Sequence, residues 1–227
     1  VRRADVFREK QGIDLRTGRR AESINRAENT VSYTDAGGHE KTLPYDRLLI
    51  ATGASPIIPD LPGVPLPGVF VLKSLEDGRR IKRHLRENTV KKAVIIGMGY
   101  IALEMCEAFR ANDIDVEMVK PRPSFIPWMN GELAEMIIEE MEKNNVRIHA
   151  GHEIRGIERH EAGLRVICSG MNIDCDIALV AIGVKPNSRL ALDAGLGLGP
   201  SGSIDVNKSL VTSDENIFAA GDCAVRT

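Results

Sequence analysis

The stretch AVIIGMGYIALEMCEAF, residues 93–109, places the run GMGYIA (97–102) between a β-like tetrapeptide and a helical pattern. In such a run the first glycine permits a sharp bend and the second lets a pyrophosphate approach the backbone. A small third residue, here Ala102, permits close packing of helix on strand, and the helix start directs its N–H groups towards an anion. We therefore predict a dinucleotide site, the alternative being a packing turn without a ligand.

Local signals on both sides of the turn predict a βαβ unit. KAVIIG (92–97) and IDVEMV (114–119) are strand-like, and the helix between them has apolar positions at Ile101, Met105 and Phe109. A helix over about 131–144 and a strand in VRIHAG (146–151) follow. The segment EIRGIERHEAGLRVICSG (153–170) predicts a two-stranded meander, and CDIALVAIGV (175–184) predicts a buried parallel strand. Residues 73–188 are expected to form one compact α/β unit.

The flanking segments are predicted to be mostly β. Short strands are expected in GIDLRTG (12–18) and RAESINR (20–26), a hairpin turning at Gly37 and Gly38, and a buried strand in DRLLIATG (46–53). ASPIIPDLPGVPLPGV (54–69) holds five of the eleven prolines and predicts a linker. Ser74 with Asp77 forms a capping-box pattern that starts a helix. The tail, 189–227, returns to short β elements, with NIFAAGD (216–222) as its last buried strand.

The composition is that of an ordinary globular chain, with a formal net charge of −2 and 43% apolar residues. Basic residues are dispersed, and clusters such as Arg79-Arg80 with Lys82-Arg83 predict a solvated helix face rather than a nucleic-acid site. No apolar run approaches the roughly 18–20 residues of a membrane span, and no signal-peptide pattern is present. Four cysteines without C-x-x-C spacing predict buried, reduced thiols, no metal site and a cytoplasmic location.

The tip of the second strand predicts which nicotinamide cofactor is bound. A ribose-reading Asp or Glu is expected roughly 20 residues after the glycines. The tip here is EMVKPRP (117–123), which offers Lys120 and Arg122 instead. Two cations favour the 2′-phosphate of NADPH over NADH. The alternative is that Lys120 is a solvent-facing loop residue.

Four motifs follow one another along the chain in an order and spacing seen in a known family. They are YDRLLIATGASPIIP (45–59), VIIGMGYIALEMCEAF (94–109), DIALVAIGVKPN (176–187) and VTSDENIFAAGD (211–222). In this the chain resembles the FAD- and NAD(P)-dependent pyridine nucleotide–disulfide oxidoreductases, most closely the coenzyme A-disulfide reductase and NADH oxidase or peroxidase branch. The resemblance implies a Rossmann-like three-layer NAD(P)-binding domain with a β-meander, residues 73–188. This domain would be inserted in parts of an FAD-binding domain, residues 1–72 and 189–227.

The resemblance also implies site residues. Those for NAD(P) would be Gly97, Met98, Gly99, Tyr100, Ile101, Glu104 and Gly183, together with Lys120 and Arg122. Those for FAD would be Ala21, Ala51, Thr52, Gly53, Gly221 and Asp222. Each has a structural alternative: Asp222 as the cap of a turn, Tyr100 as a core residue and Glu104 as a surface carboxylate.

The implied activity is hydride transfer from NAD(P)H to FAD and onward to a disulfide, peroxide or oxygen, in a homodimeric full-length enzyme. The family's first glycine-rich FAD unit, its redox-active cysteine and its dimerisation domain find no match here, so we expect a fragment whose catalytic cysteine lies upstream. Cys223 adjoins the AAGD motif without a partner and is expected to be structural. The alternatives are a reductase of a rubredoxin-like or ferredoxin-like protein and a non-catalytic nucleotide-binding module.

Overall fold

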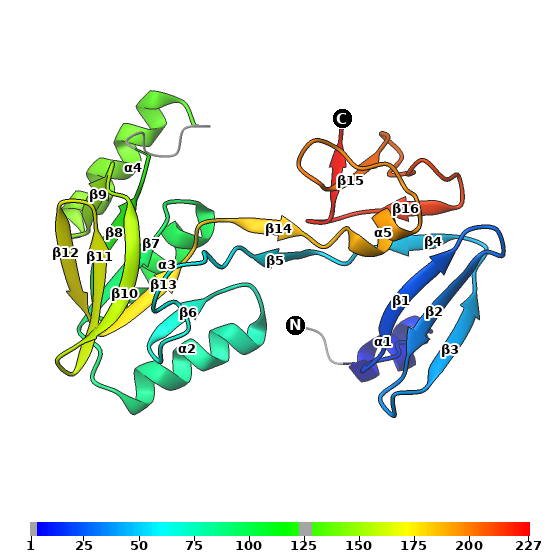
Figure 1. The fold of residues 1–227 in the computed structure, drawn as a ribbon, viewed down its shortest axis with the longest axis horizontal. Coiled ribbons are helices and arrows are strands. Elements are labelled where there is room, and N and C mark those ends of the chain that lie inside the picture. Colours follow the sequence, from blue (N-terminus) through cyan, green and yellow to red (C-terminus); the bar gives the residue numbers. More distant parts are fainter. Residues whose placement is uncertain (1–3, 123–128) are drawn as a thin grey trace. The chain divides into compact units, whose positions relative to one another are not determined.

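The computed structural model describes residues 4–122 and 129–227, which form two compact units. Unit 1 comprises residues 1–54 and 186–227, and unit 2 comprises Ser55–Lys185. The chain passes from unit 1 to unit 2 in strand β5 (Ala54–Pro56) and returns in β14 (Val184–Pro186), and these two strands pair with each other (Figure 1). The compact units divide at 54/55 and 185/186, while the boundaries at 72/73 and 188/189, expected for the domains that bind FAD and NAD(P), stay a prediction.

Unit 2 is built on a five-stranded sheet with the order β6-β13-β7-β8-β9. All neighbouring strands in it are parallel. The strands are β6 (Val69–Val71), β7 (Lys92–Ile96), β8 (Asp115–Lys120), β9 (Arg147–Ala150) and β13 (Ile177–Val180). The predicted βαβ unit, in which α3 (Tyr100–Arg110) connects β7 to β8, is confirmed.

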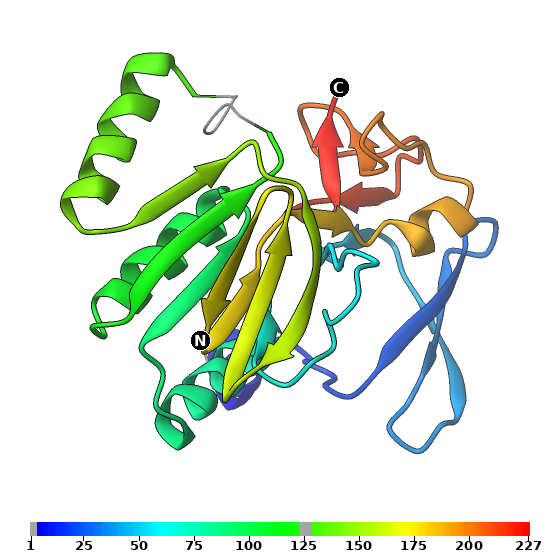
Figure 2. The same cartoon turned by 60° about the vertical axis from the view of Figure 1, so that its left-hand side comes forward.

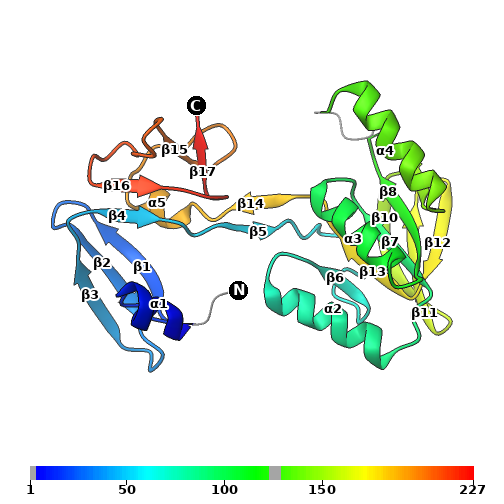
Figure 3. The ribbon, with the colours of Figure 1, turned by 180° about the vertical axis from the view of Figure 1, so that it is seen from behind.

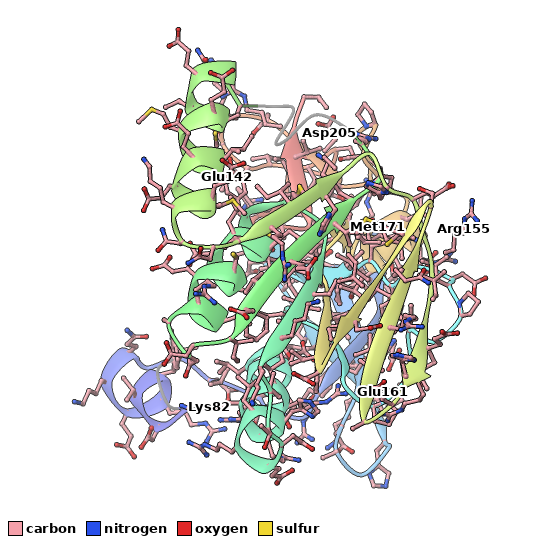
Figure 4. All side chains as sticks on the ribbon, turned by 90° about the vertical axis from the view of Figure 1, so that its left-hand side faces the viewer. Lys82, Glu142, Arg155, Glu161, Met171 and Asp205 are labelled. Carbon is pink, nitrogen blue, oxygen red and sulfur yellow. The ribbon has the colours of Figure 1, made fainter. Side chains whose placement is uncertain are left out.

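The two faces of this sheet bury different partners. One face packs with α2 (Leu75–Glu87), α3 and α4 (Gly131–Lys143) around a core that includes Phe109 and Met118. The other face packs with the antiparallel meander β10 (Ile154–His160), β11 (Gly163–Cys168) and β12 (Met171–Cys175). Figure 2 shows the meander crossing the sheet, and Figure 4 shows Glu161 and Met171 at opposite turns of the meander. The meander was predicted with two strands and has three, because β12 is a separate element ahead of β13.

Local sequence explains features of the two helices that flank β7 in the chain, α2 and α3. Ser74 accepts a hydrogen bond from the N–H of Asp77, and the Asp77 carboxylate accepts from the N–H of Ser74, so the predicted capping box of α2 is confirmed. In α3 the buried positions are Ala102, Cys106 and Phe109, while Ile101 and Met105 of the apolar pattern are half-buried. Small residues on this face let the helix approach the sheet closely.

The composition of the proline-rich segment predicted a linker, but the structure shows that this segment packs against the rest of unit 2. Pro62 accepts a hydrogen bond from the N–H of Ile157 at 2.8 Å, and Leu61 and Leu66 pack against the core on the meander side. A Cβ at Gly63 would overlap the carbonyl group of Ile157, so only glycine fits there. The prolines thus hold an extended chain against the meander.

A buried carboxylate joins three strands of unit 2. Glu117 in β8 is 5% exposed and lies 2.7 Å from Lys92 Nζ in β7. In β9, Arg147 Nη2 lies 3.0 Å and His149 Nε2 lies 2.6 Å from its two oxygens. Burial by itself raises the pKa of Glu117, but hydrogen bonds from Lys92 and His149 and the nearby cations outweigh it and hold this pKa below its usual value.

Unit 1 contains small sheets around a second core. Its elements are α1 (Ala4–Gln11), β1 (Arg20–Asn25), β2 (Thr30–Thr34), β3 (Glu40–Pro44), β4 (Leu48–Ile50), α5 (Arg189–Asp193), β15 (Ile204–Val206), β16 (Ile217–Ala219) and β17 (Ala224–Arg226). The predicted hairpin is confirmed as β2 and β3. Ile24, Ile50, Ile204 and Ile217 belong to one buried cluster.

Three expectations for unit 1 were wrong. Residues 12–18 form no strand, because Gly12 and Gly18 adopt positive φ angles and bend the chain at both ends. The tail includes the five-residue helix α5 and is not made of β elements alone, although β16 in NIFAAGD is its last buried strand, as predicted, since β17 is at most half-buried. Leu49 in β4 is 59% exposed, so this strand is buried on one side only. In the described part of the chain, none of the helices has the length and apolar character needed to cross a membrane.

Candidate functional site

The turn after β7 is held by its neighbouring strands. Gly97 has a φ of +119° and donates its N–H to the carbonyl of Val119 in β8 at 2.8 Å. Ala181, just past β13, donates to the carbonyl of Ile96 at 2.8 Å. A Cβ at position 97 would overlap the carbonyl oxygen of Ala181. The ends of β7, β8 and β13 therefore meet at a position that only glycine can occupy.

The next glycine, Gly99, lies beside open space, in contrast to the crowded Gly97. No described atom lies within 4 Å of a Cβ built on Gly99, whose backbone is extended. Gly99 is also the N-cap of α3, and no side chain of the described residues caps that helix. In contrast, Ser74 caps α2 and Asn130 caps α4. Among the described residues, no side chain caps the start of α3 and the space over Gly99 is open, and a helix start of this kind can bind an anion.

The predicted residues around Gly99 differ in what they expose. Met98 is 5% exposed and its side chain belongs to the core, so only its backbone can face a ligand. Ile101 is half-buried. Tyr100 is 65% exposed, so its alternative interpretation as a core residue is wrong. Glu104 is exposed one helical turn after Tyr100, on the same side of α3, and its reading as a surface carboxylate stays open.

Gly183 lies at the same end of the sheet. It follows β13 by three residues and has a φ of +129°. Its carbonyl accepts the N–H of Ile57 at 2.9 Å. Because Ala181 touches Gly97, the segment 181–183 and the glycine turn lie side by side at the carboxyl ends of β13 and β7.

The cationic pair lies at the end of β8. Lys120 is the last residue of that strand and is only 9% exposed, so the alternative of a solvent-facing loop residue is wrong. Burial and the charge of Arg122 lower the pKa of the Lys120 ammonium. The carbonyl of Lys120 accepts the N–H groups of Gly151 and His152 at 3.0 and 3.1 Å. The preceding residue, Val119, bonds to Gly97, so the pair is anchored beside the glycine turn.

In unit 1, the ATG and AAGD motifs come together through parallel strands. Strand β4 pairs with β16 in the register Ile50↔Ala219, and Ala220 donates its N–H to the carbonyl of Ile50 at 3.1 Å. Both motifs follow directly at the carboxyl ends of these neighbouring strands. Gly53 and Gly221 adopt positive φ angles, and no described atom lies within 4 Å of a Cβ built on either. Ala51, Thr52 and Asp222 are exposed.

Asn187 supports the ATG loop and was not among the predicted site residues. Its side-chain amide donates to the carbonyl of Thr52 at 3.0 Å, and its N–H donates to the carbonyl of Gly53 at 2.9 Å. Thr52 Oγ1 in turn donates to the carbonyl of Asn187 at 2.6 Å. The signal was present in the sequence, because Asn187 ends the motif DIALVAIGVKPN.

Ala21 is the predicted residue that is not brought to this edge. It is exposed in β1, opposite Tyr33, next to an irregularity in the β1–β2 pairing. Its sheet has the order β1-β2-β3 and includes neither β4 nor β16.

The four cysteines are free and buried, as predicted. Burial raises the pKa of Cys106 to about 11 and that of Cys175 to about 12, and it also raises that of Cys168. The Cys223 thiol is fully buried and donates to the carbonyls of Ala220 and Ile50. Buried thiols with raised pKa values are poor nucleophiles, and the geometry of Cys223 fits its predicted structural role.

Comparison with known proteins adds a family. The family model described as pyridine nucleotide-disulphide oxidoreductase matches residues 2–227. An NAD(P)H sulfur oxidoreductase (CoA-dependent) of Pyrococcus furiosus is 37% identical over 97% of this chain and 49% of its own. An NADH oxidase of Methanocaldococcus jannaschii is 34% identical over 96% and 48%. The structure of an NAD-dependent persulfide reductase from A. fulgidus superposes with a TM-score of 0.91 at 35% identity, covering 99% of this chain and 41% of that one. The chain thus spans about half the length of the curated relatives it matches.

Proposed function

The chain belongs to the pyridine nucleotide-disulphide oxidoreductase family, in the branch of NADH oxidases and coenzyme A disulfide reductases, and from this premise we propose that it is the nucleotide-binding core of a flavin-dependent oxidoreductase. Its reaction is hydride transfer from NAD(P)H to FAD, followed by reduction of a disulfide, peroxide or oxygen. Residues 73–188 form the NAD(P)-binding domain, and residues 1–72 and 189–227 contribute to the FAD-binding domain.

One observation supports the nucleotide site above all others: the uncapped start of α3 beside an open glycine. The pyrophosphate would lie over Gly99 and accept hydrogen bonds from the first N–H groups of α3. The backbones of Gly97, Met98 and Ile101 line this approach. The positive end of the helix dipole adds a charge contribution of about 0.3–1 kcal/mol.

Exposed residues at the same end would bind the rest of the dinucleotide. The nicotinamide half would lie between the Tyr100–Glu104 side of α3 and the segment that holds Gly183. The exposed Tyr100 ring would act as a gate in front of this half. The adenosine half would extend towards the end of β8, where Lys120 and Arg122 stand. Burial and the charge of Arg122 lower the pKa of the Lys120 ammonium, and a 2′-phosphate beside it would favour the charged form, which supports NADPH over NADH.

The FAD contacts of this chain would come from the adjacent ATG and AAGD motifs. Open backbone at Gly53 and Gly221 allows close approach of a flavin nucleotide, and Asp222 would accept a hydrogen bond from a ribityl hydroxyl. Ala21 would present its backbone to the adenine. The bound FAD supplies the hydride and electron transfer, while this chain positions it and the nicotinamide. The buried cysteines take no part in the chemistry, so the redox cysteine is expected elsewhere in the enzyme.

Calorimetric titration of the purified, folded chain with NADPH and with NADH tests the proposal. Saturable heat with either nucleotide supports it, and stronger binding of NADPH supports the role of Lys120 and Arg122. A folded chain that gives no binding heat with either nucleotide contradicts the site at Gly99. Equal affinities for the two would retain the site and contradict the cofactor preference alone.

A further inference from the structure

A cavity lies in unit 2, between the proline-rich segment, β6 and α2, which runs beside β6 (Figure 3). Its volume is about 900 Å³, within the range of small-molecule sites. None of the predicted nucleotide residues lines it. The cavity therefore needs an explanation independent of the dinucleotide.

One side of α2 faces this cavity. Arg80, Arg83, His84 and Glu87 line it, and they occupy positions i, i+3, i+4 and i+7 of the helix. Ile81 points into the core instead. Arg79, Lys82 and Arg86 are exposed on α2 without lining the cavity, and Figure 4 labels Lys82. The basic cluster seen in the sequence is thus divided between a solvated side and a side that lines a cavity.

His84 holds a buried hydrogen-bond donor without an acceptor. The amide nitrogen of Asn88 donates to the carbonyl of His84 at 2.9 Å, which fixes the orientation of that amide. The same nitrogen lies 3.3 Å from Nδ1 of His84 and can only donate to it. The proton of the neutral ring is therefore on Nε2, which is buried and has no hydrogen-bond partner among the described residues. A buried donor left without an acceptor is unfavourable, and a ligand oxygen would satisfy it.

Two arginines of α2 line the same cavity as His84. Arg80 lies over the ring of Phe70, 5.9 Å from its centroid, and His84 contacts the same ring at 5.1 Å between centroids. Arg83 lines the cavity and has no ion-pair partner within the described part of the chain. An anion in the cavity would thus meet the unpaired guanidinium of Arg83, one residue before His84 on the same helix.

The remaining walls are mostly apolar. Pro59, Leu61, Val64, Pro65, Leu66 and Pro67 face the cavity from the proline-rich segment, and Val69, Phe70 and Val71 face it from β6. Two carboxylates, Asp60 and Glu87, also line it and oppose a highly charged ligand such as a polyphosphate. We propose that this cavity binds a monocarboxylate with an apolar body. The carboxylate takes hydrogen bonds from Arg83 and from His84 Nε2, for which it enters between Phe70 and α2, and the apolar body lies against the prolines.

The probe for this site is 4-phenylbutyrate, titrated into the whole chain by calorimetry and followed by amide chemical shifts in residues 64–87. Saturable binding is expected, with shifts centred on Phe70 and Arg83. The neutral analogue 4-phenyl-1-butanol is expected to bind about tenfold more weakly, because it has no charge to pair with Arg83. Arg83→Gln is expected to weaken phenylbutyrate binding about tenfold, while the matched variant Lys82→Gln on the solvated side leaves it unchanged.

A second variant separates the role of His84 from the folding of α2. His84→Phe keeps a ring against Phe70 and removes the orphan donor, so the ligand-free chain is expected to be at least as stable to urea as the wild type, with weaker phenylbutyrate binding. Absence of saturable binding to the folded wild-type chain overturns the proposal. Equal affinity for the acid and the alcohol, or an equal effect of Arg83→Gln and Lys82→Gln, overturns it as well. These outcomes are independent of nucleotide binding at Gly99.

Discussion

The carbonyl oxygen of Ala181 lies against Gly97, in the space where any side chain at position 97 would begin. This contact joins the end of β13 to the turn after β7, while the N–H of Gly97 joins the same turn to β8. Two residues further on, Gly99 faces open space. The two glycines of one motif therefore have different tasks, and substitutions can separate them.

Replacing Gly97 is expected to damage the fold. In Gly97→Ala the new methyl group overlaps the Ala181 carbonyl and an L-residue is forced to a φ of +119°. Strain and overpacking together should lower the free energy of unfolding by roughly 3 kcal/mol or more. Urea denaturation monitored by circular dichroism measures the change. A variant as stable as the wild type would show that the strand ends yield at this contact.

Replacing Gly99 is expected to affect binding instead. The backbone of Gly99 is extended, which any residue adopts, and a side chain there meets no described atom. Gly99→Val should therefore change the free energy of unfolding by about 1 kcal/mol or less. Its side chain would occupy the space over α3, so nucleotide affinity by calorimetry should fall at least about tenfold. Undiminished affinity in this variant would place the pyrophosphate elsewhere.

Removing the Lys120 charge is expected to change the choice of nucleotide. In Lys120→Gln the affinity for NADPH should fall about tenfold while that for NADH changes little, because only the 2′-phosphate pairs with the ammonium. Lys120→Glu should shift the ratio further towards NADH. The exposed Lys91 provides the control, since Lys91→Gln should leave both affinities unchanged. An unaltered NADPH to NADH ratio in both Lys120 variants would mean that Lys120 does not contact the 2′ position.

The Glu117 cluster is expected to make stability depend on pH. Glu117 has a lowered pKa in the folded chain, so its ionised form stabilises the fold above its ordinary pKa of 4.5, and this contribution is lost as pH falls through the lowered value. Glu117→Gln should lower the free energy of unfolding by about 2 kcal/mol at pH 7, since Arg147 and Lys92 are partly exposed and their attraction is screened. The difference between wild type and variant should shrink below pH 4.5. Denaturation curves at several pH values measure it, and a difference independent of pH would indicate a packing effect.

The cysteines are expected to be unreactive in the native chain. All four are buried, and the raised pKa values of Cys106 and Cys175 keep those thiols protonated at neutral pH. A thiol-specific chromogenic disulfide reagent should label no thiol rapidly in the folded chain and four per chain in guanidinium chloride. Rapid labelling of a native cysteine, identified by mass spectrometry, would reopen a redox role for it.

Elements with strong local signals could be predicted from the sequence. The capping box at Ser74, the strand–turn–helix at Gly97 and the hairpin at Gly37 each depend on residues close together in the chain, and all three form as predicted. The meeting of the ATG and AAGD motifs, in contrast, depends on β4 pairing with β16, more than 160 residues apart by the register Ile50↔Ala219. Only the resemblance to a family suggested that these motifs belong together.

What could not be predicted depends on packing between distant segments. The proline-rich stretch was expected to be a linker because its composition cannot form a helix, yet its carbonyl at Pro62 pairs with Ile157 of the meander. The burial of Lys120 is a second case, since its position in the sequence does not reveal that residues 151 and 152 fold over its carbonyl. The cavity beside α2 forms only where the proline-rich segment and the helix come together, so no short stretch of sequence predicts it.

Two hydrogen bonds lie where the chain passes from one unit to the other, and they bear on whether the inserted unit can be replaced by that of a relative. In unit 2, Ile57 is hydrogen-bonded to Gly183, so that unit begins and ends at one point. In unit 1, Gly53 is hydrogen-bonded to Asn187, which closes the chain of that unit across the same insertion. Each unit is therefore closed by its own hydrogen bond, and we expect that replacing the inserted unit with a relative's leaves the path of the host chain unchanged.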